Sequence, residues 1–159
     1  MSGDGAPTGE VGGLDASGLK VTVVSGTWHA TIADGLLQGA LRVLEAAGAD
    51  VTVVRAAGSF ELPVLSQAAL RAGAEAVVAL GVIIRGGTPH FEFVSDAATS
   101  GLTQVALATG KPVGFGVLTL DTEQQGLDRA GFPDSKEDKG AEAAEAAIRT
   151  ALALRAIHG

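Results

Sequence analysis

Four short apolar runs, rich in β-branched residues and regularly spaced, constrain the fold of this chain most. They are Lys20–Val24 (KVTVV), Val51–Val54 (VTVV), Ala76–Ile84 (AVVALGVII) and Pro112–Leu118 (PVGFGVL). Such runs are typical of strands that are buried on both faces. Their first residues lie 31, 25 and 36 positions apart, which is the spacing of βαβ units. Because the crossovers of such units are right-handed, we expect one parallel sheet.

Helical patterns occupy the segments between and after these runs. They cover Ile32–Ala47, Pro63–Ala72, Phe91–Ala108, Thr122–Ala130 and Ala141–Ile157. We therefore predict a three-layer α/β/α sandwich, in which a four-stranded parallel sheet carries helices on both faces. Residues 1–18 are rich in Gly, Asp and Ser, and we expect them to form a flexible arm. Residues 19–159 are long enough for a single domain with its own core.

Composition and charge narrow the class of partner. The chain has 159 residues, of which 47% are hydrophobic and 18% charged, as in a globular domain. Its net charge of −7 argues against binding to a nucleic-acid backbone, which needs clustered Lys and Arg. No apolar run approaches the roughly 20 residues of a membrane span, and no signal peptide is apparent. We therefore expect a cytoplasmic protein that binds small molecules, and neither nucleic acid nor membrane.

The third apolar run ends in a distinctive turn, within the stretch GVIIRGGTPHFEF. Gly86 and Gly87 can adopt backbone angles that other residues avoid. Thr88 is a good N-cap and Pro89 suits a first helical position, so we predict a tight turn into a helix N-terminus. The free N–H groups and the positive end of that helix would bind an anion, and a phosphate suits the site. The same residues also fit a well-made turn without any ligand.

His90 follows this turn and is one of three histidines in the chain. A neutral imidazole beside a bound substrate can carry protons in both directions. Taken alone, a histidine in this position is more often a polar surface residue. The histidines at 29, 90 and 158 have no paired ligands at useful spacing, and there is no cysteine, so we predict no metal site.

The segments after the first two runs are also candidates, because ligands of parallel sheets bind beyond the carboxyl ends of the strands. Trp28, in SGTWHA, could stack on a flat heteroaromatic ring or could pack its loop onto the core. In GSFELP, the backbone of Ser59 and Phe60 would face the same crevice. Glu61 could accept hydrogen bonds from a polyhydroxyl chain, or could only favour a helix N-terminus.

Two cations near the C-terminus each have two interpretations. Arg129, in LDRAG, matches ordinary capping at the end of a helix before Gly131, or it could clamp a phosphate. Lys139, in EDKGAE, stands at a helix start, where positive charge is unfavourable. That position suggests a function, although a solvated surface lysine is also consistent with it.

Taken together, these segments resemble the 6,7-dimethyl-8-ribityllumazine synthase family, which catalyses the penultimate step of riboflavin biosynthesis. The matching stretches are SGTWHATIADGLLQGA, GSFELPV, ALGVIIRGGTPHFEFV, GVLTLDTEQQGLDRAG and DKGAEAAEAA. Their order and spacing fit from about Leu14 to Ile157, and GVIIRGGTPHFEFV is the most specific part. The resemblance implies a flavodoxin-like fold and a transferase-type condensing enzyme. It would join 5-amino-6-(D-ribitylamino)uracil to 3,4-dihydroxy-2-butanone 4-phosphate, with loss of phosphate and water, and it needs no cofactor or metal.

The resemblance also implies roles for individual residues, which fall into three groups. The residues that would hold the ribitylaminouracil are Trp28, Ser59, Phe60, Glu61, Val82, Ile83, Ile84 and Phe115. The residues that would bind the butanone phosphate are Gly86, Gly87, Thr88, Arg129 and Lys139. His90 would be the catalytic acid and base. Ser59 stands where the family often has Ala, and His29 where it often has Asn, but neither change removes a catalytic group.

The resemblance further implies an assembly, because the family builds its sites between adjacent subunits of a pentamer. Phe115 lies inside the fourth run and Arg129 and Lys139 lie on later helices, so one subunit would not easily gather them with Trp28 and His90. Some family members assemble twelve pentamers into an icosahedral shell. The loop GFPDSKEDKG is longer than the tight version typical of shells, which favours a free pentamer. The N-terminal arm would lie along a neighbour and could add a strand to its sheet.

Two other interpretations remain open at this point. A non-enzymatic flavodoxin-like module that binds a flavin or nucleotide would use Trp28, Glu61 and the glycine turn. It would leave His90, Arg129 and Lys139 without a role. A compartment shell protein with secondary catalysis would form particles far larger than a pentamer.

Overall fold

The computed structural model describes residues 4–5 and 13–159, and its elements follow the predicted alternation of strands and helices. The 3₁₀ helix η1 is the one element that was not expected. In chain order the elements are β1 (Lys20–Gly26), α1 (Ala30–Ala46), β2 (Asp50–Ala56), η1 (Ser59–Glu61), α2 (Leu62–Arg71), β3 (Ala76–Ile84), α3 (His90–Thr109), β4 (Val113–Leu120), α4 (Glu123–Leu127) and α5 (Lys139–His158).

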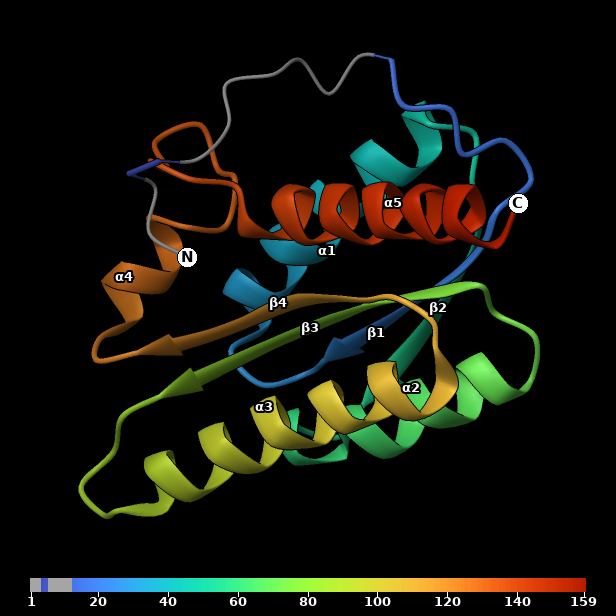
Figure 1. The fold of residues 1–159 in the computed structure, drawn as a ribbon. Helices are drawn as coiled ribbons and strands as arrows, with labels where there is room; N and C mark the ends of the chain where they lie inside the picture. Colours follow the sequence, from blue (N-terminus) through green and yellow to red (C-terminus); the bar gives the residue numbers. More distant parts are fainter. Residues whose placement is uncertain (1–3, 6–12) are drawn as a thin grey trace.

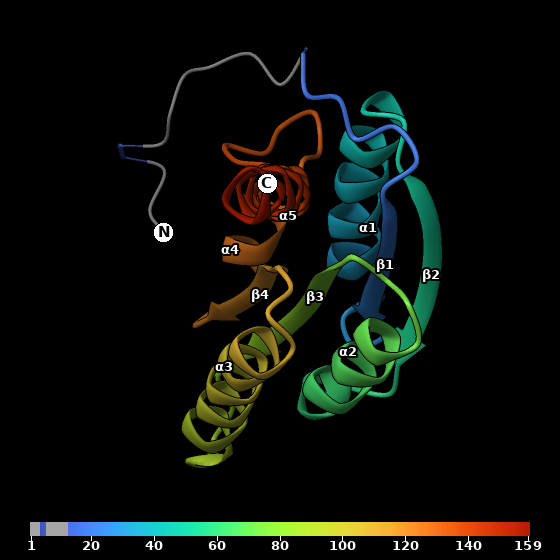
Figure 2. The same cartoon turned by 45° about the vertical axis from the view of Figure 1, so that its right-hand side comes forward.

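The four strands form one parallel sheet in the order β2-β1-β3-β4. Helices α1 and α5 cover one face of the sheet, and α2 and α3 cover the other (Figure 1). Figure 2 shows the sheet between these two helix layers. Each layer has its own cluster of buried apolar side chains against the sheet. The architecture is therefore the predicted flavodoxin-like three-layer sandwich with a four-stranded parallel sheet.

The central strand β3 and the edge strand β2 differ in how deeply they are buried. Every residue of the central strand β3 except Ile84 is buried, as its continuous apolar run predicted. β2 lies at the sheet edge and is mostly exposed or half-buried, with Val53 exposed by 40%. The prediction that the run Val51–Val54 is buried on both faces is therefore wrong. The reason is its place in the sheet, because β2 pairs with β1 alone among the described strands.

The helix expected over residues 122–130 is shorter in the structure, because α4 ends at Leu127. Thr122 and Gln125 close its start with a capping box, in which each side chain accepts a hydrogen bond from the other's backbone N–H. Gly131 has a φ of 74° and turns the chain beyond the helix rather than capping it. In α5, the Asp138 carboxylate caps the helix start two residues before the predicted one. No helix within the described residues is long and apolar enough to cross a lipid bilayer.

Helices α1 and α5 pack closely, because glycines lie at their contact. A Cβ atom on Gly140 would collide with the backbone carbonyl of Leu36, and one on Gly39 would collide with the Asp138 carboxylate. Asp138 also forms an ion pair with Arg42 of α1. The start of α5 is thus fixed against α1 by backbone contact as well as by charge.

Only part of the predicted N-terminal arm, residues 1–18, belongs to the described structure. Residues 1–3 and 6–12 lie outside the described residues, and so does the strand that they could add to a neighbour. Ala16 is buried, and its N–H donates a hydrogen bond to the carbonyl oxygen of Ala47 at 2.8 Å. The segment just before β1 therefore packs against the end of α1 in the same subunit.

Candidate active site

A cavity of about 630 Å³ opens beyond the carboxyl ends of β1 and β3. These strands are neighbours in the sheet, but the helices that follow them, α1 and α3, cover opposite faces. Open parallel sheets bind ligands at such a switch point. The cavity walls come from residues 28–29 before α1, residues 58–61 around η1, and nine of the residues between 82 and 94, at the end of β3 and the start of α3.

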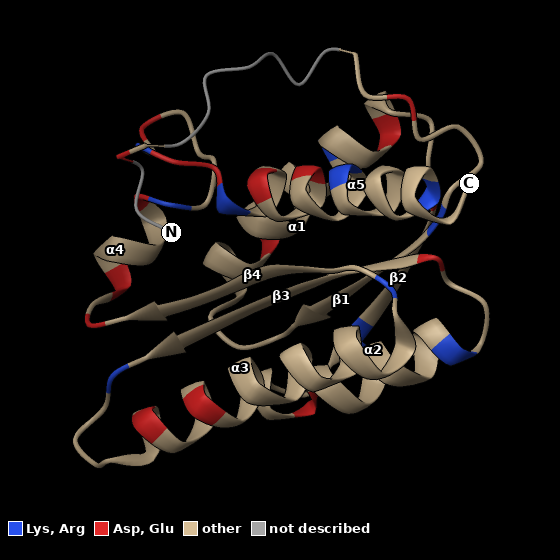
Figure 3. Ribbon diagram, in the orientation of Figure 1, with Lys and Arg blue, Asp and Glu red and all other residues tan. Residues whose placement is uncertain are grey.

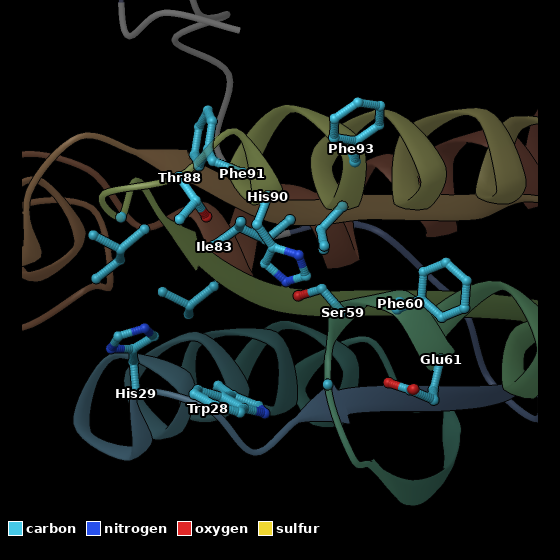
Figure 4. Close-up of a pocket in the computed structure, with 15 residues that line it drawn as sticks. Trp28, His29, Ser59, Phe60, Glu61, Ile83, Thr88, His90, Phe91 and Phe93 are labelled. Carbon is cyan, nitrogen blue, oxygen red and sulfur yellow. The ribbon is translucent and has the colours of Figure 1, made fainter.

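Trp28 and His29 form one wall of this cavity (Figure 4). The Trp28 side chain is 66% exposed, so it does not pack its loop onto the core and one face of the indole is available for stacking. The preceding hydroxyl, on Thr27, donates a hydrogen bond to the carbonyl of Ala57 at 3.1 Å and ties this loop to the segment after β2. His29 has a φ of 55°, a left-handed conformation that few non-glycine residues adopt.

Residues 58–61 form the adjoining wall. Ser59 is buried, and a Cβ on Gly81 would lie 2.6 Å from its hydroxyl oxygen, so Gly81 allows η1 to approach β3 closely. A Cβ on Gly58 would lie 3.3 Å from a carboxylate oxygen of Glu61 and 3.4 Å from Nε1 of Trp28. The carboxylate and the indole therefore flank the same glycine, next to the exposed ring of Phe60 (Figure 4). A ligand with a flat ring and a hydroxylated chain could contact both groups at once.

The end of β3 supplies the apolar floor. Val82 and Ile83 are buried and Ile84 is half-buried, and all three line the cavity. The pairing of Ile84 with Leu120 of β4 fixes the strand to its last residue. This floor is rigid because it belongs to the sheet rather than to a loop.

The turn between β3 and α3 differs from the prediction in two respects. Helix α3 begins at His90 with Pro89 as its N-cap, and the Thr88 hydroxyl makes no capping hydrogen bond. Gly86 and Gly87 do not have positive φ angles, and a Cβ on either would meet nothing within 4 Å. The fold of the subunit alone therefore does not require these glycines. Glycine also serves where another group approaches the backbone closely, and the open space at the turn is consistent with that use.

His90 is the first residue of α3, and its imidazole points into the cavity, toward Ser59 and the floor at Ile83 (Figure 4). Trp28 lies across the cavity from it, on the loop before α1. The start of α3 also contributes Phe91, Phe93 and Val94 to the lining. Sequence reasoning missed these apolar residues, although their position in the first turns after the glycine bend was a usable signal.

Arg85 anchors the turn from outside the cavity. Its guanidinium donates hydrogen bonds to Asp121 at 2.9 Å and to Glu92 at 2.5 Å, and it lies 4.3 Å from the centre of the Phe91 ring. These hydrogen bonds raise the pKa of Arg85, with the bond to Glu92 as the larger cause, and the bond from Arg85 lowers the pKa of Glu92. Sequence reasoning did not foresee this network, which links the end of β3, the start of α3 and the end of β4.

Comparison with known proteins decides the family. The family model described as 6,7-dimethyl-8-ribityllumazine synthase matches residues 18–155. The chain belongs to the 6,7-dimethyl-8-ribityllumazine synthase family. Three proteins called 6,7-dimethyl-8-ribityllumazine synthase support this assignment over their whole length. The one from Clavibacter sepedonicus is 74% identical over 100% of this chain and 99% of its own length. The one from Clavibacter michiganensis subsp. michiganensis is 71% identical with the same coverage. The one from Leifsonia xyli subsp. xyli is 70% identical over the full length of both chains.

Membership in the lumazine synthase family decides between an enzyme and a non-enzymatic binding module. The chain is a condensing enzyme of the transferase type in riboflavin biosynthesis, and not a non-enzymatic flavin- or nucleotide-binding module. The cavity contains the features that such a reaction uses, an aromatic wall, an apolar floor and an imidazole. Among the described residues, no group of three or more His, Cys, Asp or Glu could hold a metal ion.

Four residues that the lumazine synthase resemblance singled out do not line this cavity: Gly87, Phe115, Arg129 and Lys139. Phe115 lies on the edge strand β4 with 48% of its surface exposed. Arg129 donates a hydrogen bond to the carbonyl of Gln125 at 2.9 Å, so its side chain caps the end of α4. Arg129 also forms an ion pair with Glu137 at 3.5 Å. Figure 3 shows that residues of both charges gather in the connection between α4 and α5.

Proposed function

We propose that this enzyme condenses 5-amino-6-(D-ribitylamino)uracil with 3,4-dihydroxy-2-butanone 4-phosphate, releasing phosphate and water. One observation carries the proposal: Trp28 and His90 line the same cavity, together with residues of the turn after β3. An exposed indole suits a flat pyrimidine, and an imidazole at a helix start suits proton transfer.

The pyrimidine and its ribityl chain would occupy the cavity proper. Trp28 stacks on the ring, and Val82, Ile83 and Ile84 hold it with apolar side chains and backbone groups. Ser59, Phe60 and Glu61 hold the ribityl side. The Glu61 carboxylate would accept hydrogen bonds from the ribityl hydroxyls, and its position beside the indole supports this assignment.

His90 acts as the general acid and base. The amine of the pyrimidine attacks the ketone of the phosphorylated substrate, and water leaves to give an imine. Loss of the proton from the neighbouring carbon then expels the phosphate and leaves an enol, which becomes a ketone. Attack of the ribityl-bearing nitrogen on this ketone, with loss of a second water, closes the ring. The substrates supply most of this reactivity, so alignment within the cavity accounts for much of the rate enhancement. A single imidazole that moves protons adds about 100- to 10,000-fold.

The phosphate would bind at the turn formed by Gly86, Gly87 and Thr88, with Arg129 and Lys139 supplied by a neighbouring subunit. The open space around both glycines supports this role for the turn, since a ligand can approach the backbone there. Arg129 and Lys139 lie outside the cavity of their own subunit, which is why a second copy is needed. Phe115 of the same neighbour would cover the pyrimidine from the side opposite Trp28.

A homopentamer is the assembly that fits this arrangement, with each site between adjacent subunits. Closed cyclic symmetry lets every subunit both receive and donate the residues. Large apolar side chains on α3 and β4 stay exposed in the single chain: Phe93 by 73%, Leu107 by 80% and Phe115 by 48%. Such surface favours association. We favour a free pentamer over an icosahedral shell because of the long loop at residues 131–140, and a cytoplasmic location stays a prediction.

The function is tested by mixing the purified full chain with both substrates and recording the absorbance and fluorescence of the lumazine product. We expect product only when both substrates are present, and a stoichiometric release of inorganic phosphate. Light scattering on the same sample would give the mass of five subunits. A protein that produces no lumazine would refute the proposed reaction, and a monomer would refute the shared site.

A further inference from the structure

One carboxylate lies between the two cations that we assign to the phosphate. The same oxygen of Glu137, Oε2, is 3.5 Å from Nε of Arg129 and 3.7 Å from Nζ of Lys139. The Glu137 side chain is only 18% exposed and that of Lys139 only 15%. Charges in such a partly buried position are screened less by solvent than surface charges are. The carboxylate therefore has a direct influence on any anion that approaches the pair.

The two cations do not depend on this carboxylate for their positions. Their backbones are paired across the α4–α5 connection: the N–H of Lys139 donates to the carbonyl of Arg129 at 2.9 Å, and the N–H of Gly131 donates to that of Glu137 at 3.0 Å. Ala130 and Asp138 form an antiparallel bridge between them. The backbone thus brings Arg129 and Lys139 together, and the side chain of Glu137 is not needed as a clamp.

The contacts of Glu137 are also weak ones. Both nitrogen–oxygen distances exceed the 2.7–2.9 Å that is typical of charge-assisted hydrogen bonds. Lys139 has a second acidic partner, Glu142, at 3.1 Å, so two carboxylates lie beside the two cations. A phosphate dianion that approaches the two cations also meets these carboxylates, and the repulsion falls if one of them moves away.

We propose that the Glu137 carboxylate occupies the place of the substrate phosphate between Arg129 and Lys139, so that the phosphate has to displace it. This inference rests on the proposed function, because it concerns the phosphate site of that reaction. Glu137 then weakens the binding of phosphate in general, and it limits the retention of the inorganic phosphate that the reaction releases. It is a residue that sets affinity, and it takes no part in proton transfer.

The test compares wild type with Glu137→Gln, which keeps the size of the side chain and removes its charge. We expect the KM for 3,4-dihydroxy-2-butanone 4-phosphate and the inhibition constant of inorganic phosphate both to fall about three- to tenfold, as relief of a like-charge contact predicts. The KM for the pyrimidine should stay within about twofold of wild type, because that substrate does not meet the pair. A purely structural role would raise these constants or lower the melting temperature instead.

Asp134→Asn is the matched control, because Asp134 is exposed, lies in the same loop and carries the same charge. Asp134→Asn should leave unchanged both the KM for the butanone phosphate and the inhibition constant of inorganic phosphate. If these constants fall as much as in Glu137→Gln, the effect comes from the net charge of the loop and not from the position of Glu137, and the proposal is overturned. Glu137→Gln constants that are unchanged or raised would also overturn it.

Direct binding of inorganic phosphate to the full-length protein, measured by calorimetry, needs no turnover and so separates this inference from the proposed function. Wild type that makes no lumazine refutes the function, yet tighter phosphate binding by Glu137→Gln would still support the displacement. Arg129→Ala should lose phosphate binding. If it binds phosphate as well as wild type, or if neither wild type nor Glu137→Gln binds phosphate, the displacement is refuted.

Discussion

The cavity beyond β1 and β3 and the connection between α4 and α5 are two parts of one proposed site, and they are built in opposite ways. In the cavity, Trp28 is 66% exposed and glycines 86 and 87 have open space around them. At the end of the connection, where α5 begins, the Lys139 side chain is 15% exposed and Gly140 is packed against the backbone of α1. The first part is left open for ligand, and the second is closed and already paired.

This difference indicates how the two parts contribute to function. In the proposed reaction, the open part would make contacts that form only when substrate is present, and the chemistry would take place there. The closed part holds charged groups that are already paired and, in the proposed assembly, would present its cations to a neighbour. Electrostatic stabilisation is most effective when its groups are organised in advance, because little reorganisation is then needed during the reaction. Variants of ligand-facing groups in the open part should therefore change catalysis or substrate affinity without changing stability, and variants in the closed part should change stability or affinity.

The largest effect is expected in the open part, at His90. His90→Ala should lower kcat about 100- to 10,000-fold, as the loss of a general acid and base does. Both KM values, the oligomeric mass and the melting temperature should stay near wild type, since the imidazole points into the cavity rather than into the core. Steady-state kinetics with each substrate varied in turn measure this. An unchanged kcat would remove the assigned role of His90, and a loss of folding would remove the contrast between the two parts.

A pair of glycine variants tests the contrast directly. Gly140→Ala places a methyl group against the backbone carbonyl of Leu36, and we expect a loss of about 3 kcal/mol in the free energy of unfolding, as severe overpacking causes. Gly86→Ala meets nothing within 4 Å in the subunit, so its stability should match wild type while its affinity for the phosphate substrate falls. Urea unfolding and steady-state kinetics measure the two effects. Equal destabilisation by both variants would contradict the assignment of Gly86 to the ligand.

The open and the closed part also differ in how much of each could be predicted from the sequence. Strand positions, sheet type and a cavity at the carboxyl ends were predictable, because β3 carries a continuous apolar run and parallel strands end at one edge. The same reasoning placed Trp28 and His90 on segments that the structure brings to one cavity. It failed for β2, whose β-branched run looks buried but lies at an edge, because local pattern does not reveal a strand's place in the sheet.

The side-chain pairing in the closed part could not be predicted from the sequence. Arg129 and Glu137 meet through a backbone bridge between two irregular segments, which no helical or strand period describes. The link from Arg85 to Asp121 likewise joins residues 36 positions apart that the β3–β4 pairing brings together. Thr88 had the residue type of an N-cap, but the helix starts after Pro89, and the choice between such neighbouring positions depends on geometry.

Arg129→Ala tests whether the closed part serves the phosphate. We expect the KM for the butanone phosphate to rise about 10- to 100-fold, which is the usual range for loss of hydrogen bonds between charged partners. The KM for the pyrimidine should change little, because Arg129 does not line the cavity that would hold this substrate. Arg149→Ala on the exposed face of α5, where Arg149 pairs with Glu145 at 2.8 Å, is a matched control and should leave both KM values alone. Equal rises in the two KM values would assign Arg129 to assembly rather than to phosphate.

The smallest effect concerns strain in the open part, at His29. Its φ of 55° is a conformation that asparagine tolerates well and that β-branched residues resist. His29→Asn should raise the free energy of unfolding by about 0.5 kcal/mol, and His29→Val should lower it by about 1–2 kcal/mol. Thermal and urea unfolding of the two variants measure the difference. Equal stability would mean that the loop before α1 relaxes freely, and the wall that carries Trp28 would then not be held in place by its backbone.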